Sequence, residues 1–137
     1  MSKTAQTKAS SSSLRDLALA PSSGFRSVLT EVPEWGGAKV ILREPSGEAW
    51  VKFREIMTVP DPEEGQEPAK LSIQEEFFRN KKADVVMFID VLLDENGDPV
   101  FSYADEQTVS EIYGPVHSRL LTQAIGLGMS QEKAEAK

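Results

Sequence analysis

The residues best suited to chemistry lie in an acidic turn that follows the longest apolar run of the chain. Asp94, Asn96 and Asp98 match positions 1, 3 and 5 of an EF-hand calcium loop. Position 6 of that loop needs glycine but holds Pro99, and position 12 needs glutamate but holds Asp105. We therefore interpret this segment as a helix C-cap followed by a tight turn, and keep a calcium-responsive binding module as the alternative.

Groups that could carry catalysis are sparse elsewhere in the sequence. The chain has one histidine, His117, and no cysteine, and the motifs of hydrolases, phosphate-binding loops and zinc peptidases do not occur. His117 falls in the first turn of a predicted helix, where we expect a surface or capping contact. Asp90 should face a gap between helices or pair with Lys or Arg. We predict that the protein is not an enzyme and holds no cofactor or metal.

The apolar run at residues 85–93, broken only by Asp90, is the element against which a core can be built. Ser72 and Glu75 form a capping box, so a helix starting there could continue into the run and end near Leu93. Residues 80–82 could instead divide it. The apolar positions that favour one continuous helix drift along a single side: Ile73, Phe77, Val85, Phe88 and Leu92.

Before this run the residue pattern predicts a hairpin and then a helix. Residues 28–32 and 39–43 alternate as strands do, and the turn between them contains two adjacent glycines. Trp35 at the hairpin tip is interpreted as cover for the core, with a binding role as the alternative. Trp50, Phe53 and Met57 recur at helical spacing after Ser46, a predicted N-cap, and we expect them in the core.

The two ends of the chain carry further helical patterns. Residues 14–20 form a short predicted helix behind Ser13, which either covers the core or serves as a mobile docking segment. A short helix is predicted at 105–113, and Pro115 suits the start of a last one. We expect Gly126 and Gly128 to end that helix.

These elements predict a mainly α (α+β) fold, a small helical domain with a β-hairpin near its N-terminus. We expect a disordered segment at 1–13, a single domain at 14–128 with a flexible acidic loop at 58–70, and a flexible tail at 129–137. The apolar residues that we expect this domain to leave for protein binding are Leu14, Leu17, Trp35, Ile125 and Leu127.

Charge and hydropathy restrict the partners. The net charge of −7 and the pI near 4.8 disfavour binding to the phosphates of nucleic acid. The longest apolar run is shorter than the about 20 residues that cross a bilayer, and the first residues lack the apolar region of a signal peptide. We expect a soluble, intracellular protein without a membrane partner.

The order of these features resembles the tail assembly chaperones of long-tailed, lambda-like bacteriophages. The resemblance covers roughly residues 32–127, and the acidic loop at 60–68 departs from it. Its most specific pieces are the turn P-E-W-G-G at 33–37 and the turn D-E-N-G at 94–97 followed by Phe101 and Ser102.

The resemblance implies a mainly helical assembly factor of the host cytoplasm that binds the tape measure protein and keeps it soluble. It further implies a longer product, made by ribosomal frameshifting, that recruits tail tube protein. It also implies self-association into a homo-oligomer and absence from the finished virion. Besides the calcium-responsive module, a generic helical adaptor stays open as an alternative.

Overall fold

The computed structural model describes residues 13–20, 23–59, 62–67 and 70–135. The predicted disorder of residues 1–12 lies outside the described residues, as do parts of the acidic loop and the last two residues. The elements in chain order are α2 (Leu14–Leu19), β1 (Ser27–Val32), η1 (Pro33–Trp35), β2 (Ala38–Arg43), α3 (Gly47–Met57), α4 (Ile73–Val91), β3 (Leu92–Leu93), η2 (Tyr103–Asp105), α5 (Glu106–Ile112) and α6 (Pro115–Glu135). The fold is mainly helical with a small antiparallel sheet, as predicted.

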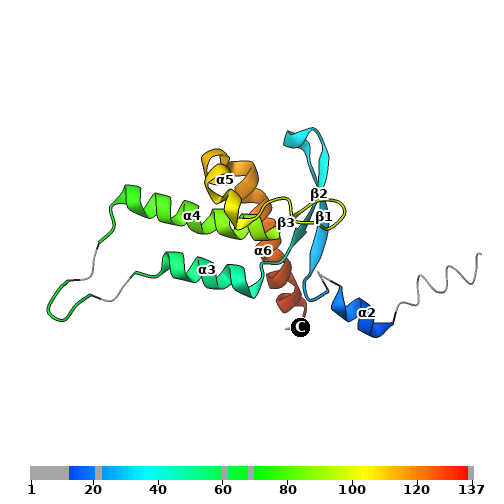
Figure 1. Ribbon diagram of the computed structural model, residues 1–137, viewed down its shortest axis with the longest axis horizontal. Coiled ribbons are helices and arrows are strands. Elements are labelled where there is room, and N and C mark those ends of the chain that lie inside the picture. The colour runs from blue at the N-terminus through cyan, green and yellow to red at the C-terminus, as the bar shows by residue number, and fades with distance from the viewer. Residues whose placement is uncertain (1–12, 21–22, 60–61, 68–69, 136–137) are drawn as a thin grey trace, which may run out of the picture.

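Helix α4 is the centre of the molecule. It packs against α3, α5 and α6, and its second half supplies most of the core, with Phe88 the largest side chain that is fully buried. The helix is continuous from the predicted capping box, in which Glu75 N–H donates to Ser72 Oγ and Ser72 N–H donates to Glu75 Oε1. Figure 1 shows α3 and α4 side by side, with their far ends extending away from the rest of the fold.

Helix α4 was predicted to end near Leu93, but it ends at Val91, before Leu92 and Leu93. They form β3, which pairs antiparallel with β2, Leu92 opposite Leu42 and Leu93 opposite Ile41. The predicted hairpin of β1 and β2 is confirmed, and with β3 beside β2 the sheet order is β1-β2-β3. The third strand was not predicted because both leucines are buried, and a fully apolar sequence has the same pattern in a buried helix as in a buried strand.

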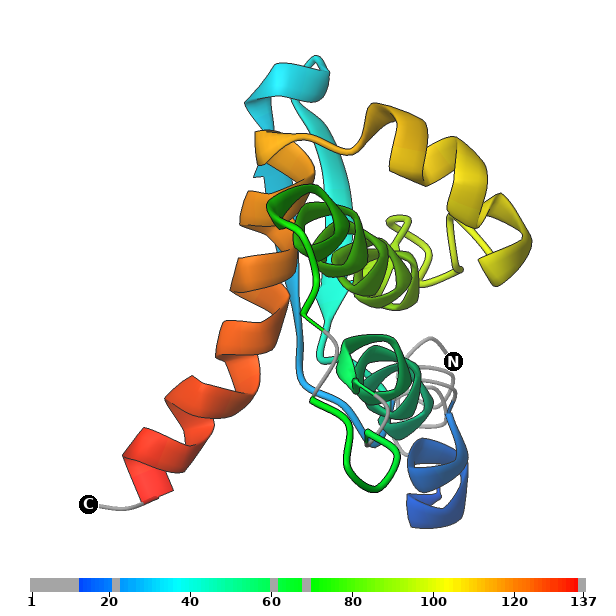
Figure 2. The ribbon, with the colours of Figure 1, turned by 90° about the vertical axis from the view of Figure 1, so that its left-hand side faces the viewer.

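The prediction that Gly126 and Gly128 end the last helix was also wrong. Helix α6 runs through both glycines to Glu135, along the sheet and against α4 (Figure 2). A Cβ atom on Gly128 would lie 2.8 Å from Glu44 Oε2, whereas one on Gly126 would meet nothing within 4 Å. Gly128 is therefore explained by the close passage of the helix beside Glu44 and not by a helix end.

The predicted apolar stripe of α3 is only partly in the core. Ser46 caps the helix as predicted, accepting from Ala49 N–H, and Ala49 is fully buried. Phe53 packs on the core, but Trp50 is 40% exposed, and its ring meets that of Phe53 edge to face with centroids 5.7 Å apart. The prediction that Trp50 lies in the core was wrong. Trp50 follows the buried Ala49, and each step along a helix rotates the side-chain direction by about 100°, so Trp50 points away from the direction of Ala49.

Candidate protein-binding surfaces

Helix α2 presents its leucines to solvent. Ser13 caps it by accepting from Asp16 N–H at 3.0 Å, as predicted, but no residue of the helix is buried. Leu14 is 82% exposed and Leu17 is 58% exposed. The interpretation of this helix as cover for the core was therefore wrong, and the docking alternative is retained as a proposal below.

A second exposed apolar surface lies on the first two turns of α4. Ile73 is 88% exposed, Phe77 59% and Phe78 56%, and the two phenylalanine rings meet edge to face with centroids 5.4 Å apart. We call these three residues the arm patch. The sequence pattern had placed Ile73 and Phe77 on the buried side, but this half of α4 extends past the helices that bury the other half (Figure 1).

The three other candidate residues lie closer to the core. Trp35 and Ile125 are partly buried and pack against it, and Leu127 is also partly exposed. The hairpin tip that carries Trp35 is fastened to α6 by Glu34, whose carboxylate accepts from Arg119 at 2.6 and 2.8 Å. This pairing lowers the pKa of Glu34 to about 2. A binding role for these three residues stays a prediction.

His117 makes the predicted capping contact. Its Nδ1 accepts from Gly114 N–H at 3.0 Å just before α6. The ring also packs among aromatic side chains, with centroids 5.2 Å from Phe88, 5.4 Å from Tyr113 and 5.5 Å from Trp35. Burial lowers the pKa of His117, because its charged form is poorly solvated there. The geometry is that of a structural residue that joins three segments.

Asp90 is paired, as expected. Its carboxylate lies 2.8 Å from Arg43 Nη2 and accepts from both Ser46 N–H and Ser46 Oγ–H, at 2.7 and 2.9 Å. Because Ser46 is the N-cap of α3, these bonds fix the start of α3 against the end of α4. The carboxylate is occupied by structural partners.

The acidic turn uses Asp94 to hold its own backbone. Asp94 Oδ1 accepts from Asn96 N–H at 2.8 Å and from Asp98 N–H at 3.0 Å, while Gly97 takes a φ of 86°. Within the described part of the chain no three His, Asp or Glu side chains are grouped so that they could hold a metal ion. That the turn does not bind calcium stays a prediction, which a titration followed by tryptophan fluorescence would test.

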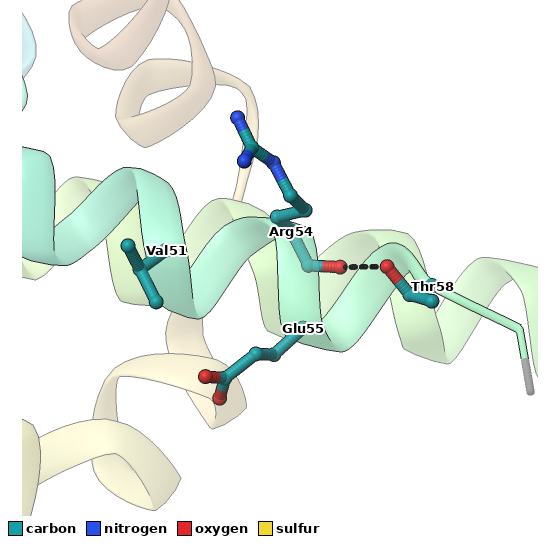
Figure 3. A pocket seen from close by; sticks show the side chains of 4 residues that line it. All are labelled: Val51, Arg54, Glu55 and Thr58. Atoms are coloured by element: carbon teal, nitrogen blue, oxygen red, sulfur yellow. Dashed lines mark hydrogen bonds between the residues drawn. The ribbon is translucent and has the colours of Figure 1, made fainter.

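A pocket of about 360 Å³ lies on the outer side of α3 (Figure 3) and is lined by Val51, Arg54, Glu55 and Thr58. Thr58 Oγ1–H donates to Arg54 C=O at 2.6 Å, while the side chains of Arg54 and Glu55 point away from each other. A catalytic site needs polar groups that converge, so these residues do not form one. None of the helices described is long and apolar enough to span a membrane.

Some helices leave apolar side chains exposed, while the polar groups described above are engaged in structural contacts. This combination is typical of a protein that works by binding other proteins. The model of the phage tail assembly chaperone family matches residues 13–137, and the chain belongs to this family. It is therefore a chaperone and not an enzyme.

A solved structure described as that of the bacteriophage HK97 tail assembly chaperone is similar over most of the fold. It is 51% identical, with a TM-score of 0.72, and the alignment covers 83% of this chain and 95% of that one. A comparison with curated proteins finds no match.

Proposed function

We propose that the protein binds the tape measure protein of its phage and keeps it soluble during tail assembly, using apolar side chains that its own fold leaves exposed. The observation that carries this proposal is the exposure of Leu14 and Leu17 on a helix without a single buried residue. A helix of six residues is not stable alone in water, so packing against a partner would stabilise it.

The proposal includes the later steps that the sequence resemblance implies. A longer frameshifted product would recruit tail tube protein, the chaperone would act in the host cytoplasm as a homo-oligomer, and it would be absent from the finished virion. The family membership supports this series of steps. The strongly acidic surface adds solubility to a complex with a long, aggregation-prone helical protein.

Substitution of both Leu14 and Leu17 by Ser tests the binding surface. Because both side chains are exposed, we expect the melting temperature to stay nearly unchanged while the amount of soluble, co-expressed tape measure protein falls several-fold. The readout is the soluble fraction of the tape measure protein, measured beside the melting temperature of the purified chaperone.

A matched control replaces Leu29 and Ile112 by Ser, since these two side chains are each 57% exposed but lie on β1 and α5 and not on α2. We expect this control to keep the tape measure protein soluble. Equal loss with both double variants would argue for a general effect of surface hydrophobicity. Full solubilisation by the variant at 14 and 17 would exclude α2 as the binding surface.

A further inference from the structure

A pocket of about 470 Å³ opens where the first half of α4 faces the junction of α5 and α6. Its lining combines apolar surface with several polar groups: Phe77, Asn80, Lys81, Asp84, Tyr113, Gly114, Pro115 and Ser118. Phe77 belongs to the arm patch, so the pocket is continuous with one of the exposed apolar surfaces. A partner that covers the arm patch would therefore also reach the pocket.

Two charged side chains line this pocket, Lys81 and Asp84, and of these Asp84 is the carboxylate. Its side chain is partly buried, and among the described residues it has no ion pair and accepts no hydrogen bond within ordinary geometry. Lys81 lines the same pocket without coming within ion-pair distance of Asp84. Burial raises the pKa of Asp84, which is the expected response of a carboxylate whose charge is not balanced.

Tyr113 adds a buried hydroxyl next to Ser118 in the same lining. Its hydroxyl oxygen is buried, and in the described part of the chain Ser118 is the side chain that approaches it, without a hydrogen bond of ordinary geometry. Burial, followed by the charge of Asp84, raises the pKa of Tyr113, so the hydroxyl stays protonated at neutral pH. The lining thus offers a carboxylate, Asp84, beside apolar side chains that include Phe77 and Pro115.

The start of α6 does not turn this pocket into an anion site. Gly114 N–H is already engaged by His117 Nδ1, and Pro115 has no N–H to offer. Asp84 would also repel a phosphate or a carboxylate. A cation is the occupant that would balance the Asp84 carboxylate, which Lys81 leaves unpaired.

We propose that the pocket receives an arginine side chain from a helix of the partner protein. The proposal rests on the chaperone function given above and specifies the chemistry of the partner. The aliphatic stem would pack on Phe77 and Pro115, and the guanidinium would pair with the Asp84 carboxylate. The net charge of −7 attracts such a basic partner helix at long range.

The first test uses n-butylguanidinium, an analogue of the arginine side chain, so it does not depend on the identity of the partner. Titration followed by NMR should give saturable shifts at Asp84 and Tyr113, with a dissociation constant on the order of 10 mM for so small a probe. Asp84→Asn should weaken this binding by about fivefold or more. Asp98→Asn, the same chemical change in the exposed acidic turn, should leave it unchanged.

Asp84→Asn removes a partly buried charge without an ion pair, so the variant is expected to fold with an unchanged or higher melting temperature. If it does not fold, Phe77→Ser, a change at an exposed position, takes its place. It should weaken binding of the probe, because it removes a ring on which the alkyl chain packs. Shifts that do not saturate, shifts that persist in both variants, or stronger binding of sulfate than of n-butylguanidinium would overturn the proposal.

The second test asks whether the pocket serves the chaperone function. We expect Asp84→Asn to lower the soluble yield of co-expressed tape measure protein, and Asp98→Asn to leave it unchanged. If the wild-type chain binds the probe but solubilises no tape measure protein, the proposed function fails while the guanidinium site stands. If solubilisation is normal in Asp84→Asn, the arginine assignment fails and the chaperone function stands.

Discussion

His117 is the residue at which the hairpin tip, α4 and the start of α6 meet. Its Nδ1 accepts from Gly114 N–H, so the neutral ring is the form that the fold requires. Because its folded pKa lies below the ordinary value of 6.5, the unfolded chain binds more protons just below that pH. The contribution of His117 to stability should therefore be constant above about pH 7.5 and decline as the pH falls through 6.5 toward the folded pKa.

Urea denaturation of the wild type and of His117→Gln between pH 7.5 and 5.5 measures this effect. Glutamine cannot titrate but can still accept from Gly114 N–H, so the decline in stability should be smaller in the variant. The difference between the two proteins removes the effect of other groups, including Asp84, whose raised pKa acts in the opposite direction. Equal pH dependence in both would contradict this role for His117.

Phe88 is the second residue whose environment predicts a measurable effect. The side chain is fully buried and its ring packs against those of Phe101, Tyr113 and His117. Phe88→Ala should lower the free energy of unfolding by about 3–5 kcal/mol, because it removes transfer energy and leaves a cavity. Chemical denaturation checks this, and a loss below about 1 kcal/mol would show that α4 is not the buried centre.

At the scale of elements, α6 offers a comparison within one helix. Gly126→Ala should raise the free energy of unfolding by about 0.5–1 kcal/mol, since alanine is the better helix former and space is open there. Gly128→Ala should raise it less or lower it. Its Cβ would displace Glu44 Oε2, while the Glu44 carboxylate accepts from Arg26 N–H at 2.6 Å and from Arg26 Nη1 at 2.9 Å.

The two variants are compared by thermal and urea denaturation. A gain at 128 equal to or larger than the gain at 126 would show that the close passage beside Glu44 does not constrain the residue.

Local signals in the sequence were enough to place several elements. The Ser72 and Glu75 capping box, the cap at Ser46 and the double glycine of the hairpin each depend on residues near one another in the chain, and all three are confirmed. Distant contacts were harder to predict. Leu92 became a strand residue because β2 lies beside it, and Gly128 fits because Glu44 approaches α6.

The candidate surfaces were predicted only in part, because their exposure also depends on distant contacts. Leu14 lies on a helix of six residues, none of them buried, and the sequence allowed an exposed docking helix as one of two interpretations. The exposure of Ile73 and Phe77 depends on how far α4 extends beyond its neighbours. Amphipathic spacing does not encode that length, since it marks a face of the helix and not the part of it that is covered.

For the whole molecule, we propose that the folded, acidic chaperone binds its partner through the exposed residues of α2 and the arm patch. Hydrogen exchange of the purified chaperone, alone and in complex with the tape measure protein, would locate the binding surface. We expect new protection of backbone amides at residues 14–19 and 73–78, with little change in the second half of α4, which is already buried. Protection of neither segment in the complex would show that the chaperone binds its partner through other surfaces.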